Sequence, residues 1–561
     1  MLRKSAFFVV VAFIADGFAA PAAQRGPADP FGVAAICLPA PAAAGQTIAV
    51  SSGDDLQSAL DRAAAGTTIV LNAGATYRPS AGGGFVLRNR PVRSGEWITI
   101  RSSSTAFDRN GAMPPGIRAT AASASEFAIL RATVNGVPAI RTDPGAHGYR
   151  LIGLDIGADA GVREVDLIEF GDGTDTTAAT EPSDIVIDRC LVHGNDAGTY
   201  RRGVALNGAR LAVVDSDFRN FHDAGTDSQA IAGWNGPGPF LIANNYLEAA
   251  SENILFGGGD PSIPGLVPSD IEIRRNVSTK PLAWRTSGIP VKNAFELKSA
   301  RRVLISGNIF ENVWPSGQDG TAILLKSANQ DGGCTWCVTE YVTFTDNIVR
   351  AASHGLLVNA AEAGAKGLAM PRHANHIRIT NVFFDGIGAQ PFGGGKLFRI
   401  FGGVDDVEIT HVTSTSNPTG ILDAHDPNDV NPHLTFASNI VERNQYGIGA
   451  GAAEGIPTLT RNFAPFVYNQ NVLVNTSATS DQAISDSSLK SRYPPVTFVA
   501  GGWSALGFAA GTHTLTSASP YYRAGTDGAS LGADMDAIAA AQQGPLTTSC
   551  GGTVAIPRVR R

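Results

Sequence analysis

Two lysines in identical surroundings have the residue type and spacing best suited to acid–base chemistry in this chain. The tetrapeptide Leu-Lys-Ser-Ala occurs at 297–300 and again at 325–328, so Lys298 and Lys326 are equivalent residues of a repeat. On neighbouring repeats, two ammonium groups roughly 5 Å apart repel by about 3 kcal/mol at an effective dielectric of about 20. This repulsion predicts a pKa lowered by up to about two units for one of them. A lysine with a lowered pKa is a general base, and its neighbour or Arg301 would stabilise negative charge.

Carboxylates fall near the same repeats and predict a metal site. Asp227, Glu252, Asp260 and Glu296 lie on successive repeats or in the loop that follows them. Carboxylate oxygens that converge are the ligands that calcium prefers, so we expect calcium as the cofactor. Two alternatives remain open. The carboxylates pair with the two lysines, or Glu252 and Asp260 form the acid pair of a glycoside hydrolase.

Aromatic and amide side chains close to these positions predict binding of a sugar chain. Trp234 offers a flat surface for a sugar ring, with Gln229, Asn207 and Asn359 as hydrogen-bonding neighbours. The alternative for Trp234 is an anchor of its own loop. Three histidines do not cluster in the repeat alignment and are interpreted as ordinary surface or turn residues: His222, His354 and His425.

The elements that position these residues are predicted by a recurring block: apolar, any, apolar, two polar residues, Asn, apolar. Its asparagines are Asn245, Asn276, Asn308 and Asn347, which are 31, 32 and 39 residues apart. A period of this size with alternating apolar residues indicates a β-solenoid. Stacked coils are roughly 4.8 Å apart, so the asparagines are expected to bond from coil to coil. We expect the ladder to continue at other positions: Asp155, Cys190 and Asp217 upstream, and Val382, Val412, Asn439 and Asn471 downstream.

A second strand in each repeat sets the orientation of the candidate residues. Aligning these strands on the two Leu-Lys-Ser-Ala segments directs alternate side chains inward and outward. The predicted outward column is listed here in chain order: Asn207, Trp234, Gly257, Lys298, Lys326 and Asn359. Long loops at 257–268, 280–292 and 328–338 interrupt the coils on one side, where repeat folds commonly build binding sites.

The fold class that follows is all-β, a single-stranded right-handed parallel β-helix with an N-terminal capping helix. Residues 52–65 read as that amphipathic helix, and it would cover the exposed strand edge at one end of the solenoid. We divide the chain into a signal peptide at 1–24, a linker at 25–48, the β-helix with its terminal caps at 49–545 and a tail at 546–561. We expect it to be a monomer.

Composition and the N-terminus restrict the partners and the compartment. The formal charge of −7 comes without a basic run, which argues against nucleic-acid binding. We also predict no membrane span. Arg3 and Lys4, followed by an apolar stretch and small residues, read as a secretory signal and predict a secreted or periplasmic bacterial protein.

The five cysteines fit export. Cys334 and Cys337 are predicted to form a local disulfide, because a zinc site would need a second pair of ligands. Cys190 is expected to be a buried thiol, and the pairing of Cys37 and Cys550 stays open.

The coil length, the Asn ladder and several segments resemble the right-handed parallel β-helix superfamily, which includes pectate lyases. The segments that carry the resemblance are Gln229-Ala-Ile-Ala-Gly-Trp-Asn, Glu252-Asn-Ile-Leu-Phe-Gly-Gly-Gly-Asp-Pro, Phe295-Glu-Leu-Lys and Ser519-Pro-Tyr to Gly528. They are similar to a branch of bacterial secreted repeat proteins that has no established activity. The signature segments of pectin hydrolases are missing. The Glu296-Leu-Lys298 segment is similar to the Glu and Lys residues of chondroitinase-B-like lyases, with different spacing.

These observations favour an enzyme acting on polysaccharide, a lyase that cleaves acidic glycan by β-elimination. Such a lyase needs a base beside the substrate carboxylate and a cation to neutralise it, which the lysines and calcium would supply. A non-catalytic solenoid that binds glycan or cell wall, a glycoside hydrolase and a purely structural solenoid are the alternatives.

Overall fold

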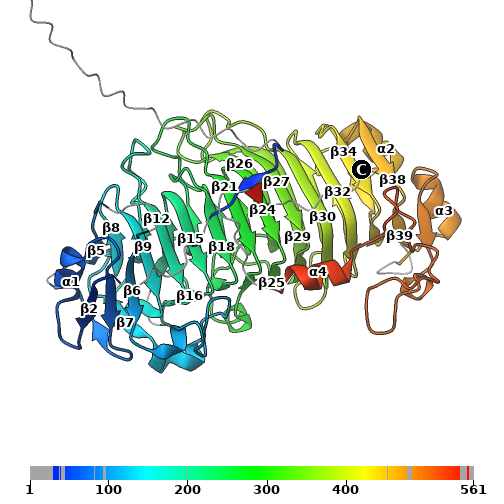
Figure 1. Ribbon diagram of the computed structural model, residues 1–561. Coiled ribbons are helices and arrows are strands. Elements are labelled where there is room, and N and C mark those ends of the chain that lie inside the picture. The colour runs from blue at the N-terminus through cyan, green and yellow to red at the C-terminus, as the bar shows by residue number, and fades with distance from the viewer. Residues whose placement is uncertain are drawn as a thin grey trace, which may run out of the picture.

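The computed structural model describes residues 29–36, 38, 45–80, 82–91, 96–163, 165–196, 199–451, 453–476, 483–543 and 553–554. The chain winds into a right-handed parallel β-helix (Figure 1). Each complete coil contributes one strand to each of three ladders, and neighbouring coils pair in parallel. Most of the apolar side chains point inward and form one continuous core along the solenoid.

The first and second ladders belong to one sheet and meet at the asparagine turn. The first ladder consists of β2 (Thr47–Val50), β3 (Thr68–Leu71), β6 (Ile98–Ser102), β9 (His147–Ile152), β12 (Ser183–Asp188), β15 (Ala209–Val214), β18 (Phe240–Ala243), β21 (Ser269–Arg274), β24 (Ala300–Ser306), β27 (Thr339–Thr345), β34 (Leu434–Ala437) and β38 (Phe466–Asn469). The second consists of β4 (Thr76–Tyr77), β7 (Ala128–Ala132), β10 (Leu154–Ala158), β13 (Leu191–His193), β16 (Asp217–Phe221), β19 (Tyr246–Ala249), β22 (Val277–Thr279), β25 (Ile309–Val313), β28 (Ile348–Ala352), β35 (Ile440–Glu442), β39 (Val472–Val474) and β40 (Phe498–Ala500). Two long strands take part in both ladders: β30 (Asn375–Asp385) and β32 (Asp405–Ser414).

The third ladder forms a sheet of its own and carries the candidate residues. Its strands are β5 (Phe85–Leu87), β8 (Ile140–Thr142), β11 (Val165–Phe170), β14 (Tyr200–Leu206), β17 (Gln229–Gly233), β20 (Ile254–Phe256), β23 (Phe295–Leu297), β26 (Thr321–Asn329), β29 (His354–Ala363), β31 (Lys396–Phe401), β33 (Gly420–Asp423) and β36 (Ile448–Ala450), closed by the antiparallel β37 (Ala453–Glu454).

The predicted asparagine ladder is confirmed. The Nδ2 of Asn276 donates to the Oδ1 of Asn308 at 2.9 Å, and the Oδ1 of Asn276 accepts from Asn245 at 3.0 Å. Upstream, two predicted positions are wrong by one residue. Ser216, not Asp217, follows Cys190 in the ladder and accepts its backbone N–H at 3.0 Å. Leu154, not Asp155, lies level with Cys190, because Asp155 pairs with Leu191. The left-handed residue of each turn is the one before the ladder position.

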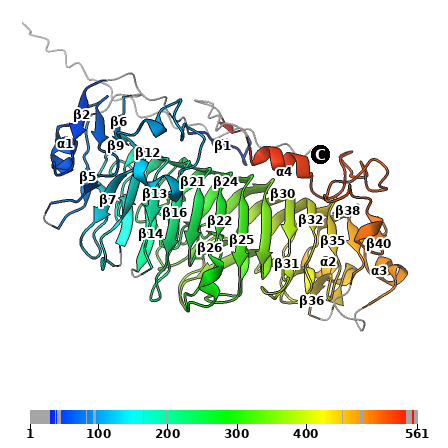
Figure 2. The same cartoon turned by 90° about the horizontal axis from the view of Figure 1, so that it is seen from below.

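Helices lie at both ends of the solenoid and along its side. At the N-terminal end, α1 (Leu56–Arg62) is shorter than the predicted 52–65, and its buried Leu56 and Leu60 pack into the apolar core. At the other end, α2 (Ile456–Asn462) contacts β36, and α3 (Asp486–Arg492) contacts β40. The last helix, α4 (Met535–Ala541), does not cover an end. It lies along the side of the solenoid next to β30 (Figure 2). Short 3-10 turns occur at Thr105–Phe107, Ala121–Glu126, Leu282–Arg285 and Trp503–Ala505.

Part of the segment interpreted as a linker packs on the first ladder. Ile36 is buried against Leu241 and its neighbours, and β1 (Val33–Ala34) contacts β21 and β24. The same short strand pairs with β41 (Thr553–Val554), which comes from the opposite end of the chain (Figure 1). The predicted signal peptide, Cys37 and Cys550 lie outside the described residues. No helix of the described residues is long and apolar enough to cross a membrane.

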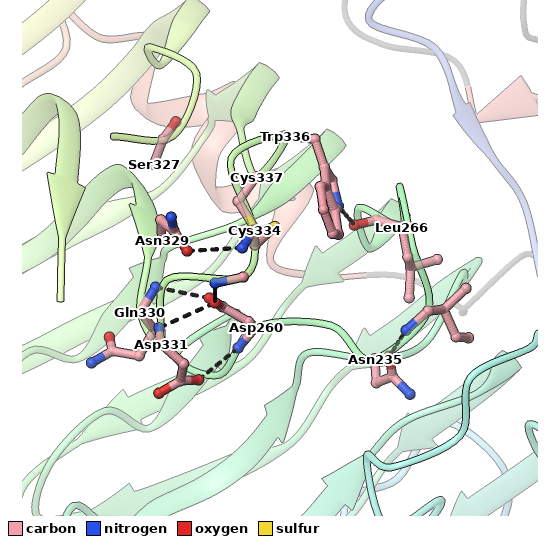
Figure 3. Close-up of a disulfide and its surroundings, with 12 residues drawn as sticks. Asn235, Asp260, Leu266, Ser327, Asn329, Gln330, Asp331, Cys334, Trp336 and Cys337 are labelled. Carbon is pink, nitrogen blue, oxygen red and sulfur yellow. Dashed lines mark hydrogen bonds between the residues drawn. A yellow bond between two sulfur atoms is a disulfide. The ribbon is translucent and has the colours of Figure 1, made fainter. Parts of the chain in front are cut away.

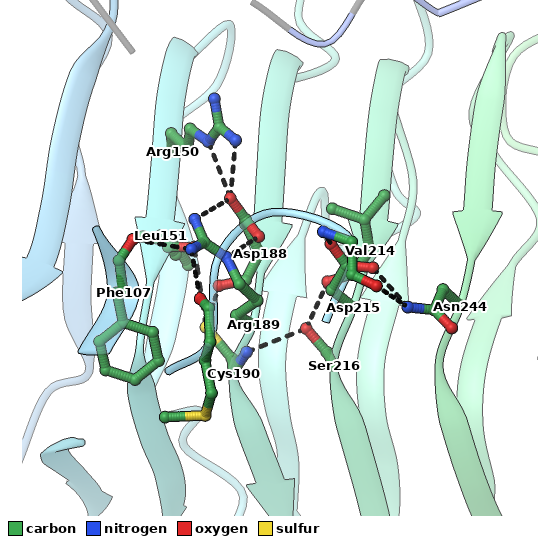
Figure 4. Close-up of polar contacts among 12 residues, drawn as sticks. Phe107, Arg150, Leu151, Asp188, Arg189, Cys190, Val214, Asp215, Ser216 and Asn244 are labelled. Atoms are coloured by element: carbon green, nitrogen blue, oxygen red, sulfur yellow. Dashed lines mark hydrogen bonds and ion pairs between the residues drawn. The ribbon is translucent and has the colours of Figure 1, made fainter. Parts of the chain in front are cut away.

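A buried ion pair anchors the loop that covers one corner of the solenoid (Figure 4). Asp188, which is 1% exposed, accepts from Arg150 and Arg189 at 2.7 Å each. Arg189 also donates to the carbonyl oxygens of Phe107 and Met113, both at 2.8 Å, which fixes the loop between β6 and β7. The expected buried thiol is confirmed, because Cys190 is free and fully buried, and this burial raises the pKa of the thiol to about 12.

Candidate functional site

The two lysines lie side by side on the outer face of the third ladder, as the repeat predicts. Leu297 pairs with Leu325, and Lys326 pairs with Asn359, so Lys298, Lys326 and Asn359 are consecutive members of one column. The lysine side chains are 15% and 9% exposed. Gly257 precedes Lys298 in the column, and its missing side chain leaves backbone beside the lysine stem.

A buried carboxylate lies between the two lysines and changes their electrostatics. The Oε1 of Glu296 is 3.4 Å from the Nζ of Lys326 and 3.9 Å from the Nζ of Lys298. Lys326 also binds Glu362 at 2.8 Å. Burial lowers the pKa of Lys326, but the two carboxylates outweigh burial and raise it above its ordinary value. The predicted lowering of its pKa is therefore wrong, because attraction to Glu296 and Glu362 replaces the expected repulsion.

Glu296 belongs to a group of four buried side chains that we call the acceptor cluster: Gln229, Glu252, Asn293 and Glu296. Each is at most 2% exposed. The Nε2 of Gln229 donates to Glu252 at 2.8 Å, and the Nδ2 of Asn293 donates to Glu296 at 3.1 Å. The Oε1 of Glu252 and both amide oxygens accept no hydrogen bond, whereas the Oε1 of Glu296 faces the two lysines. Burial, with Glu296 and Asp227 adding, raises the pKa of Glu252 to about 7.

This arrangement could hold a hard cation. A buried acceptor without a donor costs about 1–3 kcal/mol, and three of the cluster's acceptors have no partner: Gln229 Oε1, Glu252 Oε1 and Asn293 Oδ1. Carboxylate and amide oxygens are the ligands of calcium, so two carboxylates and two amides fit the ion. The four carboxylates predicted from the sequence do not converge, since no three acidic, His or Cys side chains of the described residues are placed to hold a metal.

Asp227 and Asp260 have other partners. Asp227 is exposed and binds Lys292 at 2.5 Å. The carboxylate of Asp260 accepts the backbone N–H groups of Gln330, Asp331 and Gly333, at 2.8, 3.2 and 2.7 Å (Figure 3). Asp260 therefore joins the loop after β20 to the loop after β26, and the hydrolase pair of Glu252 and Asp260 is not formed.

The predicted disulfide is confirmed and belongs to the same pair of loops. Cys334 and Cys337 are bonded, and both are buried. Between them, the Nε1 of Trp336 donates to the carbonyl oxygen of Leu266 at 3.0 Å, which gives the two loops a second connection (Figure 3). These loops adjoin the end of the strands that carry Lys298.

Several of the predicted sugar-binding residues already have partners within the protein. Arg202 stacks over the Trp234 ring at 4.8 Å, and Gly173 and Gly259 approach the same ring closely, so Trp234 is a loop anchor rather than an open platform. Asn207 is fully buried and accepts the backbone N–H groups of Trp234 and Asn235. Asn359 remains half-buried in the outward column.

Arg301 points away from the lysines. It belongs to the first ladder, where it binds Glu340 at 2.6 Å, so its proposed role as charge stabiliser is not supported.

Two residues of the site escaped the sequence analysis. Asn293 is recognisable only by register, because it takes the place of Glu252 one coil later. Lys280 lies in a loop without any repeat signal, yet it is fully buried. Its Nζ donates to the carbonyl oxygens of Ala249 and Ser251 and to Asn253, at 2.8, 2.7 and 3.0 Å. These bonds fix the turn that presents Glu252.

No sequence family and no curated protein matches this chain. Among solved structures it is similar to the PL6 family alginate lyase AlyGC, with 12% identity and a TM-score of 0.48 over 78% of this chain and 53% of that chain. A mannuronic acid specific family 6 lyase from human gut microbiota shows 13% identity and a TM-score of 0.43, over 81% of this chain and 91% of that one. Pectate lyase Pel9A shows 14% identity and a TM-score of 0.37, over 88% and 96%. The match spans about half the length of AlyGC. The assignment of the fold rests on the strand pairing described above.

Proposed function

We propose that this chain is a polysaccharide lyase that cleaves an acidic glycan by β-elimination. The observation that carries the proposal is the pair Lys298 and Lys326 on the outer face of the third ladder, around Glu296 and beside the acceptor cluster. Such a lyase combines a general base with positive charge next to a sugar carboxylate.

Lys298 is the better base of the two lysines. Lys326 is held by Glu296 and Glu362 and keeps its proton. Lys298 is 3.9 Å from Glu296, beyond hydrogen-bond distance, and it lies next to Gly257 and Gly258. An added Cβ at Gly257 would lie 2.9 Å from the Lys298 Cβ, so glycine lets the backbone of the preceding coil lie directly against the lysine stem.

The reaction assigns one task to each lysine. The amine of Lys298 removes the proton from the carbon beside the sugar carboxylate. The electron pair forms a double bond to the next carbon, and the glycosidic oxygen leaves with a proton from solvent. The ammonium of Lys326 offsets the negative charge that develops on the carboxylate, which lowers the barrier.

The acceptor cluster is the proposed calcium site, through Gln229, Glu252, Asn293 and Glu296. Bound there, calcium supplies positive charge against the substrate carboxylate. We extend the proposal to a monomeric protein secreted by a bacterium. Mass spectrometry of the exported chain, with loss of residues 1–24 as the expected result, tests the secretion.

The test is turnover of uronate-containing polysaccharides, followed by the ultraviolet absorbance of the unsaturated ends, with calcium and with chelator. We expect Lys298→Ala to lower the rate at least 1,000-fold at unchanged melting temperature, and Lys298→Arg to do the same because an arginine stays protonated. Lys490→Ala on the exposed face of α3 is the matched control. Full turnover by Lys298→Ala would refute the assignment of the base.

Glycoside hydrolysis is the alternative reaction. The pKa of Glu252, raised to about 7, suits a proton donor at neutral pH, but its predicted partner Asp260 binds the loop after β26 instead. A hydrolase would release reducing ends without ultraviolet absorbance, so chromatography of the same reaction mixtures separates the two reactions. If the protein binds the tested glycans but cleaves none of them, it is a glycan-binding solenoid instead.

A further inference from the structure

The outer face of the third ladder continues beyond the lysines to a second feature suited to sugar binding. The column of Glu296 runs on through Leu324, Leu357, Arg399 and Asp423 to Gly449 in register. These are five strand steps, or roughly 24 Å along the solenoid axis. A cavity of about 190 Å³ lies at the end of this column.

The walls of this cavity combine an exposed aromatic ring, bare backbone and an ion pair. Tyr446 is 54% exposed, and its hydroxyl accepts from Gln445 at 2.7 Å. Gly420 and Gly449 line the same cavity and lie beside the base of the Tyr446 side chain, where an added Cβ would be 3.7–3.8 Å from the Cβ of Tyr446. The two glycines therefore contribute bare backbone, without side chains, to the cavity wall near Tyr446.

The ion pair gives the cavity its polar partners. Lys396 binds Asp423 at 2.5 Å, with side chains 35% and 22% exposed. A sugar ring presents C–H groups on one face and hydroxyls at its edge. An exposed aromatic ring next to a carboxylate and an ammonium matches both, since few placed polar groups in an otherwise apolar pocket fix a ligand.

We propose that this cavity, centred on Tyr446, is a distal subsite that holds a sugar ring of the same glycan chain that reaches Lys298. The ligand is a long polysaccharide. One chain can reach both places because they lie on the same face of the sheet and in the same register. The identity of the polymer as an acidic glycan rests on the proposed function. A chain shorter than the roughly 24 Å between the two places cannot occupy both. The subsite therefore discriminates by chain length, and avidity adds to the affinity of long chains.

The experiment compares Tyr446→Ala with Tyr522→Ala, an exposed tyrosine on the C-terminal segment. Each full-length variant is tested for retention in gels containing uronate polymers and for binding of disaccharides of the same composition. We expect Tyr446→Ala to weaken retention by the polymer about tenfold and to leave disaccharide binding unchanged. Tyr522→Ala should behave as wild type.

The outcomes separate this inference from the proposed function. Equal polymer retention by Tyr446→Ala and Tyr522→Ala, with turnover that depends on Lys298, would overturn the subsite and leave the lyase standing. A loss of retention confined to Tyr446→Ala, without turnover of any polymer, would support the subsite and refute the lyase. Absence of retention by every polymer would overturn the subsite, and an equal loss for polymer and disaccharide would do the same.

Discussion

Substitution of Glu252 by Gln tests the acceptor cluster most directly. Glu252 is 1% exposed, and its pKa is raised to about 7 from an ordinary value of 4.5. At 1.36 kcal/mol per unit, this corresponds to roughly 3 kcal/mol. A raised pKa means that the folded protein holds the proton more tightly than the unfolded chain. The stabilisation that comes from this proton is therefore complete below pH 4.5 and is lost as the pH rises through 7.

In the presence of chelator, the wild-type protein should thus be about 3 kcal/mol less stable at pH 8 than at pH 4.5 on account of this group. For a chain of 561 residues, this amounts to roughly 3 °C in melting temperature. In the proposed site, calcium would bind the ionised carboxylate, so it should raise the melting temperature at pH 8 and have little effect at pH 4.5. Glu252→Gln should stabilise the chelated protein at pH 8 by up to about 3 kcal/mol and abolish the effect of calcium.

Glu272 provides a matched control. It is a carboxylate on the first ladder, 2% exposed, and burial also raises its pKa. Glu272→Gln should therefore change the pH dependence of stability yet leave the calcium effect intact. Differential scanning fluorimetry of the three proteins, at both pH values, with calcium and with chelator, gives the comparison. A calcium effect that survives in Glu252→Gln, or that disappears equally in both variants, would refute the assignment of the site.

Two further predictions concern the solenoid itself. Asn276→Ala should lower the free energy of unfolding by at least about 3 kcal/mol, because it removes hydrogen bonds to both neighbouring coils and leaves buried groups without partners. Chemical denaturation measures this change. A loss below about 1 kcal/mol would show that the ladder is not a source of stability. β1 pairs antiparallel with β41, Ala34 opposite Thr553, and in the sequence Cys37 follows Ala34 by three residues while Cys550 precedes Thr553 by three. We therefore expect a disulfide between these cysteines, formed by exchange with an oxidised dithiol or glutathione disulfide, and non-reducing peptide mapping that finds both thiols free would exclude it.

The sequence by itself determined the fold and the column of the lysines. The recurring asparagines mark the turn of each coil, because a buried amide on the corner finds its partners in the amide and the backbone of the neighbouring coils. Once that period is known, strand alternation places Lys298 and Lys326 on the outer face. Both features are local patterns that repeat, so they can be read along the chain.

The partners of those lysines were decided by the tertiary structure. Whether Glu296 separates two lysines or merely flanks them depends on which side chains the stacked coils bring together. The same holds for Asn293, which enters the cluster by its register alone. Asp260 was predicted as a ligand, but a loop 70 residues further along the chain supplies three N–H groups that bind it.

The direction of the pKa shift of Lys326 was also decided by the tertiary structure. The sequence predicted a lowered pKa for one lysine from the charge of the other, while the structure adds Glu362 and Glu296 and raises the pKa of Lys326. Electrostatic energy varies with the distance to every neighbouring charge and with burial. Spacing along the chain gives the distance between repeats. The distances within a coil, and the loss of water around each group, exist only once the coils are stacked.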